Sequence, residues 1–333
     1  MKNANEMPLY DAKRFMGITH PILEAHLIYT AIELDLFKNL STPVTVEKLA
    51  GTTGCHVKNL TLLLNALTAT QYISKQADTY QNFPETDYYL NPESEMYLGE
   101  HILYWRDMTN LENLTELVKN GPGEIAFSDK KGSDFFDFRS MGQGARNSMY
   151  IGRVQKFIGT LKQLFNENDT FSVLDLGGGS GILSIEIARN FRNAKATVFD
   201  QPFVTEMTRR VIEEYGVSCQ VQTQDGNFVT DDFGSGYDFI IASGIIDFFG
   251  DLAVMTKRLY NVLNDNGILY VSTHGINESF TGPAQFIMGW LSSHLNGLDI
   301  LKPDPVIRRA FADAGFVQVE PEIAPNVFIL KKK

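Results

Sequence analysis

The chain of 333 residues is poor in cysteine and histidine and has no long hydrophobic run. Its two cysteines, Cys55 and Cys219, lie far apart, so no disulfide framework is implied. The six histidines are scattered and form no His/Cys/carboxylate set at metal-ligand spacing, so we expect no bound metal. No apolar run approaches the length of a membrane span, and Met1–Arg14 lacks the apolar segment of a signal peptide. We therefore expect a cytoplasmic protein with no membrane partner.

Basic residues are also in deficit. Lys and Arg total 29 against 40 Asp and Glu, which gives a formal net charge of −11 at pH 7. That balance disfavours non-specific binding to nucleic acid and to anionic membrane surfaces. Hydrophobic residues make up 44% of the chain and charged residues 21%, as in globular proteins, and the length suffices for two domains.

The first part of the chain is predicted to be helical, with one hairpin. Ile22–Phe37 has an apolar stripe at helical spacing, Val46–Ala50 begins a short helix, and His56–Tyr72 forms another. Tyr72–Ser74 and Thr79–Asn82 flank a turn and form a two-stranded wing. Three helices followed by a wing is the order of a winged-helix domain.

A winged helix that binds DNA needs several Lys or Arg side chains on the helix that enters the groove. Here that helix offers Lys58 and little else that is basic. We therefore expect packing or dimerisation, and a winged-helix regulator or ligand sensor stays open as the alternative from another class. Further helical segments, Tyr97–Asn120 and Phe135–Leu164, are separated by the linker Gly121–Gly123. The predicted division is 1–120 for the first domain, 121–165 for bridging helices and 166–333 for the second domain.

From Phe171 onward, predicted strands alternate with predicted helices. This alternation indicates an α/β class fold, a Rossmann-like doubly wound sheet with an antiparallel closing pair. The predicted strands are Phe171–Leu176, Ala196–Phe199, Cys219–Thr223, Tyr237–Ala242, Gly267–Thr273, Val317–Glu320 and Val327–Lys331.

The most informative stretch is Val173–Gly181, VLDLGGGSG, where an apolar strand runs into a glycine turn and then into a helix. The next strand ends at Asp200, and parallel strands bring such residues to the same carboxyl edge, where ligands bind. A carboxylate there suits two ribose hydroxyls. A dinucleotide fingerprint would place its third glycine one position later and pyrophosphate on the helix N-terminus. Here Asp175 precedes the glycines, and an acid would repel pyrophosphate but hold a cationic amino-acid group.

Five segments resemble one family. Ala31–Phe37 is similar to its helix end A-x-x-L-G-I-F-D, and Val46–Ala50 to its t-x-x-e-L-A. Leu174–Gly181 is close to V-D-V-G-G-G-x-G, Val198–Pro202 to V-F-D-L-P, and Asn264–Gly267 to the L-x-P-G-G turn before the fifth strand. With these motifs the chain resembles the two-domain small-molecule O-methyltransferases, such as the caffeate-type, bacterial polyketide and acetylserotonin enzymes. They are class I S-adenosylmethionine-dependent methyltransferases.

The resemblance implies S-adenosyl-L-methionine as cofactor, a homodimer formed through the first domain, and methylation of a small acceptor in secondary metabolism. Gly177 and Gly179 would lie under the methionine part, and Asp200 would bind the ribose. Asn227 stands where the family often has an acid for the adenine amino group, with Asp225 nearby. Turn formation is a competing explanation for both residues. The cofactor-binding residues so implied are Asp175, Gly177, Gly179, Asp200, Gln201, Asp225, Gly226, Asn227, Phe228 and Ser243.

The expected catalytic residues depart from the family pattern. Asp247 replaces the family's histidine after the fourth strand, in an apolar setting that would let it act as a base. The alternative is a carboxylate that simply caps or begins the next helix. His274, after the fifth strand, is the second candidate, and a swapped arrangement in which it faces Asp247 is a hypothesis. O-methylation is favoured, with C- or N-methylation, or a cofactor-retaining enzyme of decarboxylation, hydroxylation or pericyclic chemistry, as alternatives.

The acceptor pocket is expected from two segments. His101–Met108 lies over the cleft in relatives, and Phe286–His294 follows the fifth strand. Aromatic and methionine residues at helical spacing are more often core, but such walls fit a flat aromatic or conjugated acceptor. No cluster of Lys or Arg marks an anionic acceptor. The substrate-binding residues expected are Tyr104, Trp105, Met108, Met149, Trp290 and His294.

Overall fold

The computed structural model describes residues 10–122, 137–298 and 300–332, with the backbone alone for 320–323. The chain divides into two compact units, Met1–Leu103 and Tyr104–Lys333. Helix α7, Gly99–Met108, contains the boundary between them. Gly123 and residues 135–136, at the edges of two predicted segments, lie outside the described residues.

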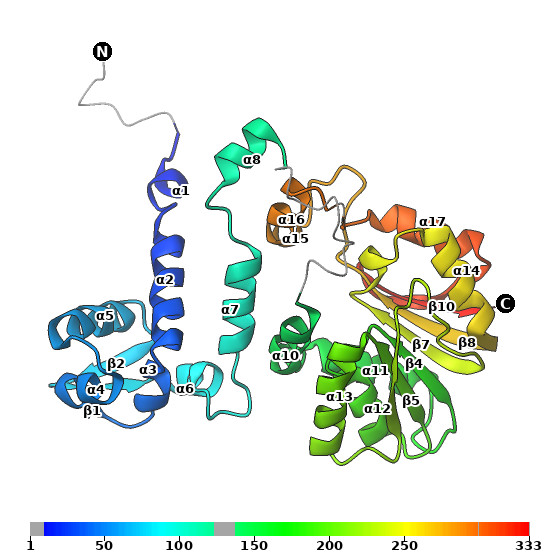
Figure 1. Cartoon of the computed structure of the whole chain (residues 1–333), viewed down its shortest axis with the longest axis horizontal. Coiled ribbons are helices and arrows are strands. Elements are labelled where there is room, and N and C mark those ends of the chain that lie inside the picture. Colours follow the sequence, from blue (N-terminus) through cyan, green and yellow to red (C-terminus); the bar gives the residue numbers. More distant parts are fainter. Residues whose placement is uncertain (1–9, 123–136, 299, 333) are drawn as a thin grey trace. The chain divides into compact units, whose positions relative to one another are not determined.

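The first unit combines helices with a three-stranded antiparallel sheet in the order β1-β3-β2 (Figure 1). Strands β2 and β3 form the predicted hairpin, and the two-residue strand β1 completes the sheet by pairing with β3. The order of elements is the predicted one of a winged helix. The elements are α1 (Lys13–Met16), α2 (His20–Glu33), α3 (Leu36–Asn39), β1 (Val44–Thr45), α4 (Val46–Thr53), α5 (Val57–Ala69), β2 (Ile73–Gln76), β3 (Thr79–Asn82) and α6 (Pro84–Leu90).

Local chemistry sets the limits of the helices in this unit. The side chain of Thr45 caps α4 by accepting a hydrogen bond from a backbone N–H in its first turn. Asp35, with a φ of 50°, separates α2 from α3, so the apolar stripe predicted over Ile22–Phe37 belongs to two helices. Ile22 and Leu23, at the start of the stripe, are 57% and 60% exposed. That part of the stripe therefore faces solvent in the single chain.

The second unit contains a seven-stranded sheet in the order β6-β5-β4-β7-β8-β10-β9. Strands β6, β5, β4, β7 and β8 are parallel, whereas β10 pairs antiparallel with both β8 and β9. All seven predicted strands are present, and the antiparallel closing pair is confirmed. The strands are β4 (Ser172–Leu176), β5 (Lys195–Asp200), β6 (Val221–Asp225), β7 (Tyr237–Ser243), β8 (Leu263–Ser272), β9 (Phe316–Ala324) and β10 (Val327–Lys332).

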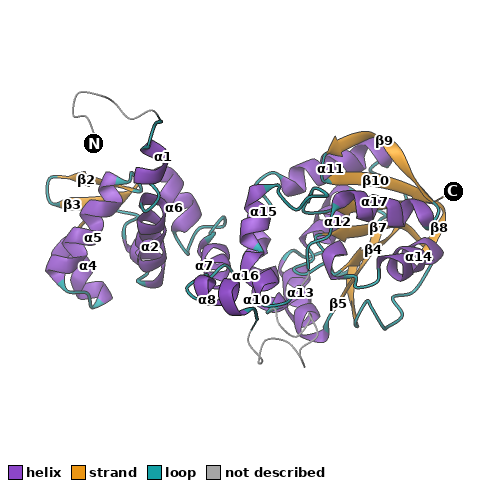
Figure 2. Ribbon diagram, turned by 90° about the horizontal axis from the view of Figure 1, so that it is seen from above, coloured by secondary structure: helices purple, strands orange, loops and turns teal. Residues whose placement is uncertain are grey.

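Helices cover both faces of this sheet (Figures 1 and 2). Successive strand residues point to opposite faces, so Val173 and Ile241 pack with α11, α12 and α13, whereas Leu174 and Ile240 pack with α14 and α17. The two apolar clusters make the core of the unit. The helices are α8 (Leu114–Asn120), α10 (Phe138–Ser148), α11 (Arg153–Leu164), α12 (Ile182–Asn190), α13 (Pro202–Glu214), α14 (Leu252–Val262), α15 (Ala284–Gly289), α16 (Leu291–Leu295) and α17 (Asp304–Asp313), with the 3₁₀ turn η1 (Ile246–Phe248).

Three predicted segments differ in detail from the structure. Tyr97–Asn120 is split into α7 and α8, and Phe135–Leu164 is split into α10 and α11. Gly152, with a φ of 93°, stands at the start of α11 and ends any continuous helix there. The predicted turn Asn264–Gly267 lies inside β8, and Asn266 has a φ of 63°. The register of β8 against β7 shifts at this point, so the turn is accommodated as a bulge.

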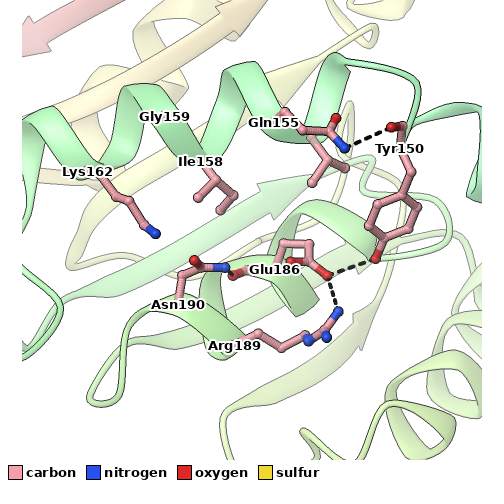
Figure 3. A pocket seen from close by; sticks show the side chains of 9 residues that line it. Tyr150, Gln155, Ile158, Gly159, Lys162, Glu186, Arg189 and Asn190 are labelled. Carbon is pink, nitrogen blue, oxygen red and sulfur yellow. Dashed lines mark hydrogen bonds and ion pairs between the residues drawn. The ribbon is translucent and has the colours of Figure 1, made fainter.

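A polar groove lies between α11 and α12, on the face of the sheet that these helices cover (Figure 3). At one end the hydroxyl of Tyr150 donates to Oε1 of the buried Glu186 at 2.8 Å, and Nη1 of Arg189 donates to the same atom at 2.7 Å. These contacts compensate the buried carboxylate and fasten α12 to the start of α11. The residues that line the groove are Tyr150, Val154, Gln155, Ile158, Gly159, Lys162, Glu186, Arg189 and Asn190.

Candidate active site

The glycine turn follows β4 at the carboxyl edge of the sheet. Gly177, Gly179 and Gly181 have φ values of 62°, 57° and 74°, a conformation that residues with a Cβ rarely adopt. A Cβ on Gly177 would lie 2.1 Å from Cδ1 of Ile245. At Gly179 the nearest atom to such a Cβ is the Cα of Gly142 on α10, at 3.8 Å. The turn therefore needs glycine and leaves its backbone bare for the approach of a ligand.

Two carboxylates support this turn. Asp200, at the end of β5, accepts the Gly179 N–H through Oδ2 at 2.9 Å and the Gln201 N–H through Oδ1 at 2.8 Å. Burial raises the pKa of Asp200, and the two backbone hydrogen bonds oppose the rise. Asp175 is 2% exposed and accepts a hydrogen bond from Ser184 Oγ at 2.8 Å. Burial raises the pKa of Asp175 to about 6. Asp200 thus lies at the edge, whereas Asp175 lies beneath the turn and acts on a ligand only through it.

The residues at the end of β6 are engaged within the protein. Oδ1 of Asp225 accepts hydrogen bonds from Thr205 Oγ1 at 2.6 Å and from Arg209 Nη2 at 2.5 Å, so its carboxylate faces α13. Oδ1 of Asn227 accepts the Val229 N–H at 2.9 Å. Both side chains therefore make contacts of the kind expected for turn and loop residues.

Arg258, on α14, fastens the loop that follows β6. Its Nη1 donates to the carbonyls of Phe228 and Val229 at 2.5 and 2.7 Å, and its Nη2 donates to the carbonyl of Asp231. Gly226 is needed at the start of this loop because a Cβ there would lie 2.4 Å from Cζ of Phe199. The loop is thereby held beside Asp200 at the end of β5, since β6 and β5 are neighbouring strands.

Asp247 and His274 face each other beyond the ends of β7 and β8. These parallel strands are neighbours, and Ser243 pairs with Ser272 at their ends, so the following loops start side by side. His274 Nδ1 and Asp247 Oδ2 are 2.6 Å apart, and the two side chains are 14% and 1% exposed. The contact is the swapped arrangement, with the carboxylate after the fourth strand and the histidine after the fifth. Since Nδ1 is engaged, Nε2 is the ring nitrogen left for another partner.

The loop before α17 holds Asp247 from a second side. The Lys302 N–H donates to Asp247 Oδ1 at 2.8 Å, and Lys302 Nζ donates to the Asp247 carbonyl at 2.5 Å. Asp251 caps α14 by accepting the Val254 N–H at 3.1 Å. Asp247 lies in the 3₁₀ turn η1, so it does stand at the start of the next helical segment, but its carboxylate does not act as the cap, because both oxygens are engaged elsewhere.

The loop that carries His274 is tied to the rest of the second unit in a similar way. Thr273 Oγ1 donates to Asp304 Oδ1 at 2.6 Å, and Asn326 Nδ2 donates to the Thr273 carbonyl at 2.9 Å. Both members of the Asp247–His274 pair are thus positioned by residues that lie far along the chain.

An aromatic wall, defined by Trp105, Phe248, Phe286 and Trp290, adjoins His274. The His274 ring meets Phe286 and Trp290 edge-on, with centroids 4.9 and 5.6 Å away. Trp290 is 4% exposed and contacts Trp105 and Phe248, each with a centroid distance of 6.0 Å. The wall therefore surrounds the His274 side of the site with apolar aromatic rings.

The structure brings together some of the predicted acceptor residues and separates others. Met149 packs against the apolar cluster of α11, α12 and α13, away from the cluster that contains Trp290. His294 Nε2 accepts the Leu301 N–H at 3.4 Å. The hydroxyl of Tyr104 is buried and has no hydrogen-bond partner among the described residues. The predicted acceptor residues that do belong to the cluster beside His274 are Trp105, Met108 and Trp290.

Arg153, the first residue of α11, is a site residue that the sequence analysis missed. Its Nη2 donates to Ser243 Oγ at 2.6 Å, at the end of β7. A Cβ built on the next residue, Gly244, would lie 3.5 Å from the same nitrogen. A charged residue at the start of a helix is ordinarily a surface residue, so no sequence signal pointed to this contact.

Within the described ranges, no group of three or more His, Cys, Asp or Glu side chains could hold a metal ion. No helix in the described part of the chain is long and apolar enough to cross a membrane. Cys55 and Cys219 are both free thiols.

The sheet order, the glycine turn after β4 and the acid at the end of β5 define the class I methyltransferase fold. Residues 111–279 match the family described as the O-methyltransferase domain, and residues 19–100 match the O-methyltransferase dimerisation domain. The chain belongs to this two-domain O-methyltransferase family, whose members are S-adenosylmethionine-dependent methyltransferases of small molecules. The family resemblance and the fold class expected from the sequence are confirmed.

Several known proteins are similar to this chain over most of its length. An uncharacterized protein of Methanocaldococcus jannaschii is 28% identical over 90% of this chain and 80% of its own. The 3-hydroxy-5-methyl-1-naphthoate 3-O-methyltransferase of Streptomyces sahachiroi is 25% identical over 76% of this chain and 74% of its own. PigF of a Serratia species, named as an S-adenosyl-L-methionine-dependent methyl transferase, is 23% identical over 88% of this chain and 87% of its own. A solved structure of PigF with SAH has the same fold, with a TM-score of 0.79, 18% identity and coverage of 97% of this chain and all of its own.

Proposed function

We propose that this methyltransferase holds S-adenosyl-L-methionine at the glycine turn and methylates a hydroxyl group of a small, flat acceptor, with His274 as the base. The observation that carries the proposal is the 2.6 Å contact between His274 Nδ1 and Asp247 Oδ2, beside the strand ends that bear the glycine turn. C- and N-methylation remain within the reach of the same site.

The residues at the turn fit the cofactor. Gly177 and Gly179 expose bare backbone to the methionine part, and the Asp200 carboxylate retains lone pairs for two ribose hydroxyls. Asn227, Gly226 and Phe228 form the loop on the adenine side, and Gln201 follows Asp200. When bound, the cofactor supplies a methyl group on a positively charged sulfur, an activated leaving group whose transfer depends chiefly on positioning. The name of PigF, an S-adenosyl-L-methionine-dependent methyl transferase, and its complex with SAH support the same cofactor for this chain.

The Asp247–His274 pair supplies proton transfer. A carboxylate that accepts the Nδ1–H of an imidazole fixes the tautomer and leaves the Nε2 lone pair for the acceptor hydroxyl. His274 takes the hydroxyl proton at Nε2, and the adjacent carboxylate stabilises the imidazolium that forms. Lys302 keeps Asp247 in place by engaging its other oxygen.

The aromatic wall selects the acceptor. Rings meet flat conjugated molecules edge-on or face-on, and Met108 belongs to the same apolar cluster as Trp290. Trp105 and Trp290 therefore contact the acceptor directly in this proposal, with Tyr104, Met149 and His294 as more distant candidates. The naphthoate O-methyltransferase of Streptomyces sahachiroi is a relative whose named substrate is of this flat kind.

The match to a dimerisation domain supports a homodimer formed through the first unit. Apolar residues of α1, α2 and the segment between them are exposed in the single chain, which gives a second copy a surface to cover. The exposed residues are Phe15, Met16, Ile18, Ile22 and Leu23. In this proposal residues 1–120 serve dimerisation, 121–165 connect, and 166–333 bind the cofactor. The two free thiols suit a reducing, cytoplasmic location.

Native mass spectrometry of the purified protein, with calorimetric titration of S-adenosyl-L-methionine and S-adenosylhomocysteine, tests the proposal. We expect both to bind to a dimer. A panel of phenols, enols and heteroaromatic molecules is then screened for a gain of one methyl group by product mass. Absence of binding by both cofactors would overturn the proposed function.

A further inference from the structure

The carboxyl edge of the sheet holds a cation whose place is defined by the strand order. Asp200 ends β5, the glycine turn follows β4, and Ser243 ends β7, and these three strands are consecutive in the sheet. Arg153 reaches this edge from the start of α11 and donates to Ser243 Oγ at 2.6 Å. Its guanidinium therefore lies on the side of the glycine turn opposite to Asp200.

The surroundings of Arg153 are those of a ligand-facing residue. Arg153 is exposed to solvent, and its guanidinium lies within electrostatic range of Tyr270 and Asp175. The contact with Ser243 uses one of five N–H donors, and Asp175 is already hydrogen-bonded to Ser184. Arg153 thus has donors left for a group outside the chain.

The direction in which the cofactor would lie across the sheet edge follows from the same order of strands. If the ribose binds Asp200, the methionine end crosses the bare backbone of the glycine turn toward β7. The methionine end carries a cationic sulfur, a cationic α-amino group and one anionic group, the α-carboxylate. The carboxylate of Asp200 lies at this edge and that of Asp175 lies beneath the turn, and both would repel the α-carboxylate. A cation on the β7 side offsets this repulsion.

We propose that the Arg153 guanidinium, held by Ser243, binds the α-carboxylate of the methionine part of the cofactor. The proposal rests on the proposed cofactor site and adds the residue that recognises its amino-acid end. A guanidinium and a carboxylate form paired, charge-assisted hydrogen bonds, which are stronger than neutral ones. Arg153 is accordingly a binding and specificity-determining residue, and Ser243 positions it.

Two adenosyl thioethers separate this role from a structural one. S-adenosylhomocysteine carries the amino-acid end, and 5′-methylthioadenosine has the same adenosine and sulfur but lacks it. Calorimetry on the full chain should show that Arg153→Met lowers the affinity for S-adenosylhomocysteine about 10- to 100-fold and leaves the affinity for 5′-methylthioadenosine unchanged. Arg153→Lys should recover part of the loss. Arg189→Met, which removes an arginine in the groove between α11 and α12, is the matched control and should change neither affinity.

Each other outcome has a definite meaning. An unchanged affinity of Arg153→Met for S-adenosylhomocysteine would overturn the assignment, and so would an equal loss for both ligands, because the role would then be structural. A rise in acceptor KM without any change in cofactor affinity would reassign Arg153 to the acceptor and would also overturn it. Failure of the unaltered protein to bind S-adenosylhomocysteine would instead refute the proposed function itself.

Discussion

The two halves of the carboxyl edge are built in different ways. On the β5–β4 side, the site consists of glycine backbone and one carboxylate, and its residues follow the family motif closely. On the β7–β8 side, it consists of long-range side-chain contacts, and the histidine and carboxylate have exchanged strands relative to the family pattern. Adjacent parallel strands end side by side, so Asp247 and His274 can contact each other whichever of the two strands each residue follows. Backbone geometry therefore constrains the cofactor half residue by residue, whereas the proposed catalytic half needs only that the two groups meet.

Replacing His274 by Ala tests the β7–β8 half most severely. A positioned general base contributes about 10²- to 10⁴-fold, so kcat on a weakly acidic hydroxyl should fall by that factor. The affinity for S-adenosylhomocysteine should stay the same, because His274 belongs to the other half. Steady-state kinetics and calorimetry measure the two quantities. Full turnover by the variant would remove His274 from the mechanism.

Asp200→Ala should damage the β5–β4 half in the complementary manner. We propose that this carboxylate binds two ribose hydroxyls, so its loss should lower the affinity for S-adenosylhomocysteine about 100-fold, because hydrogen bonds to a charged group are strong. Asp225→Ala is the control, since the carboxylate of Asp225 faces Thr205 and Arg209, and its effect should stay within about threefold. Calorimetry that found equal losses in both variants would contradict the different roles.

The buried Asp175 predicts a pH dependence of stability. Its pKa of about 6 in the folded protein lies above the usual carboxyl value near 3.9, so the folded state binds more protons between these values. Stability should therefore fall as pH rises from about 4 to about 6 and then level off. Asp175→Asn should lack this fall and gain about 3 kcal/mol relative to the unaltered protein by pH 7. Urea denaturation at pH 5 and pH 7.5 measures the difference, and a constant difference would contradict the assignment.

A pair of glycine substitutions gives the smallest expected effects. Gly177→Ala places a Cβ in left-handed conformation and 2.1 Å from Cδ1 of Ile245, so we expect a loss of about 1–2 kcal/mol in stability. Gly51→Ala, inside α4 with no atom within 4 Å of the new Cβ, should stabilise by about 0.5–1 kcal/mol. Thermal denaturation compares them. Equal shifts would mean that the turn has no special backbone requirement.

The parts predicted well from the sequence are those set by short-range patterns. Periodicity predicts the seven strands and the wing, and the glycine turn is a local motif that the structure reproduces. The two-residue strand β1 has no period to detect and exists only because it pairs with β3. The break at Asp35 likewise depends on tertiary packing of α2 and α3, since an apolar stripe continues across it.

Contacts between distant segments account for what the sequence analysis missed at the site. The contact between Asp247 and His274 can be predicted from the sequence, because the two residues follow strands that are adjacent in the sheet. Arg153 reaches Ser243 across 90 residues of chain, and Lys302 reaches Asp247 across 55, with no motif at either cation. The engagement of Asp225 by Arg209 also depends on side-chain direction at the end of a strand. Sequence spacing carries no information on these directions.

The aromatic wall also makes the protein its own optical probe. The chain has two tryptophans, Trp105 and Trp290, and both belong to this wall, with ring centroids 6.0 Å apart. All indole emission therefore originates in this wall, and Trp290 is in direct contact with the ring of His274. An acceptor that packs against the wall should therefore change the intrinsic emission, which can be followed without any label.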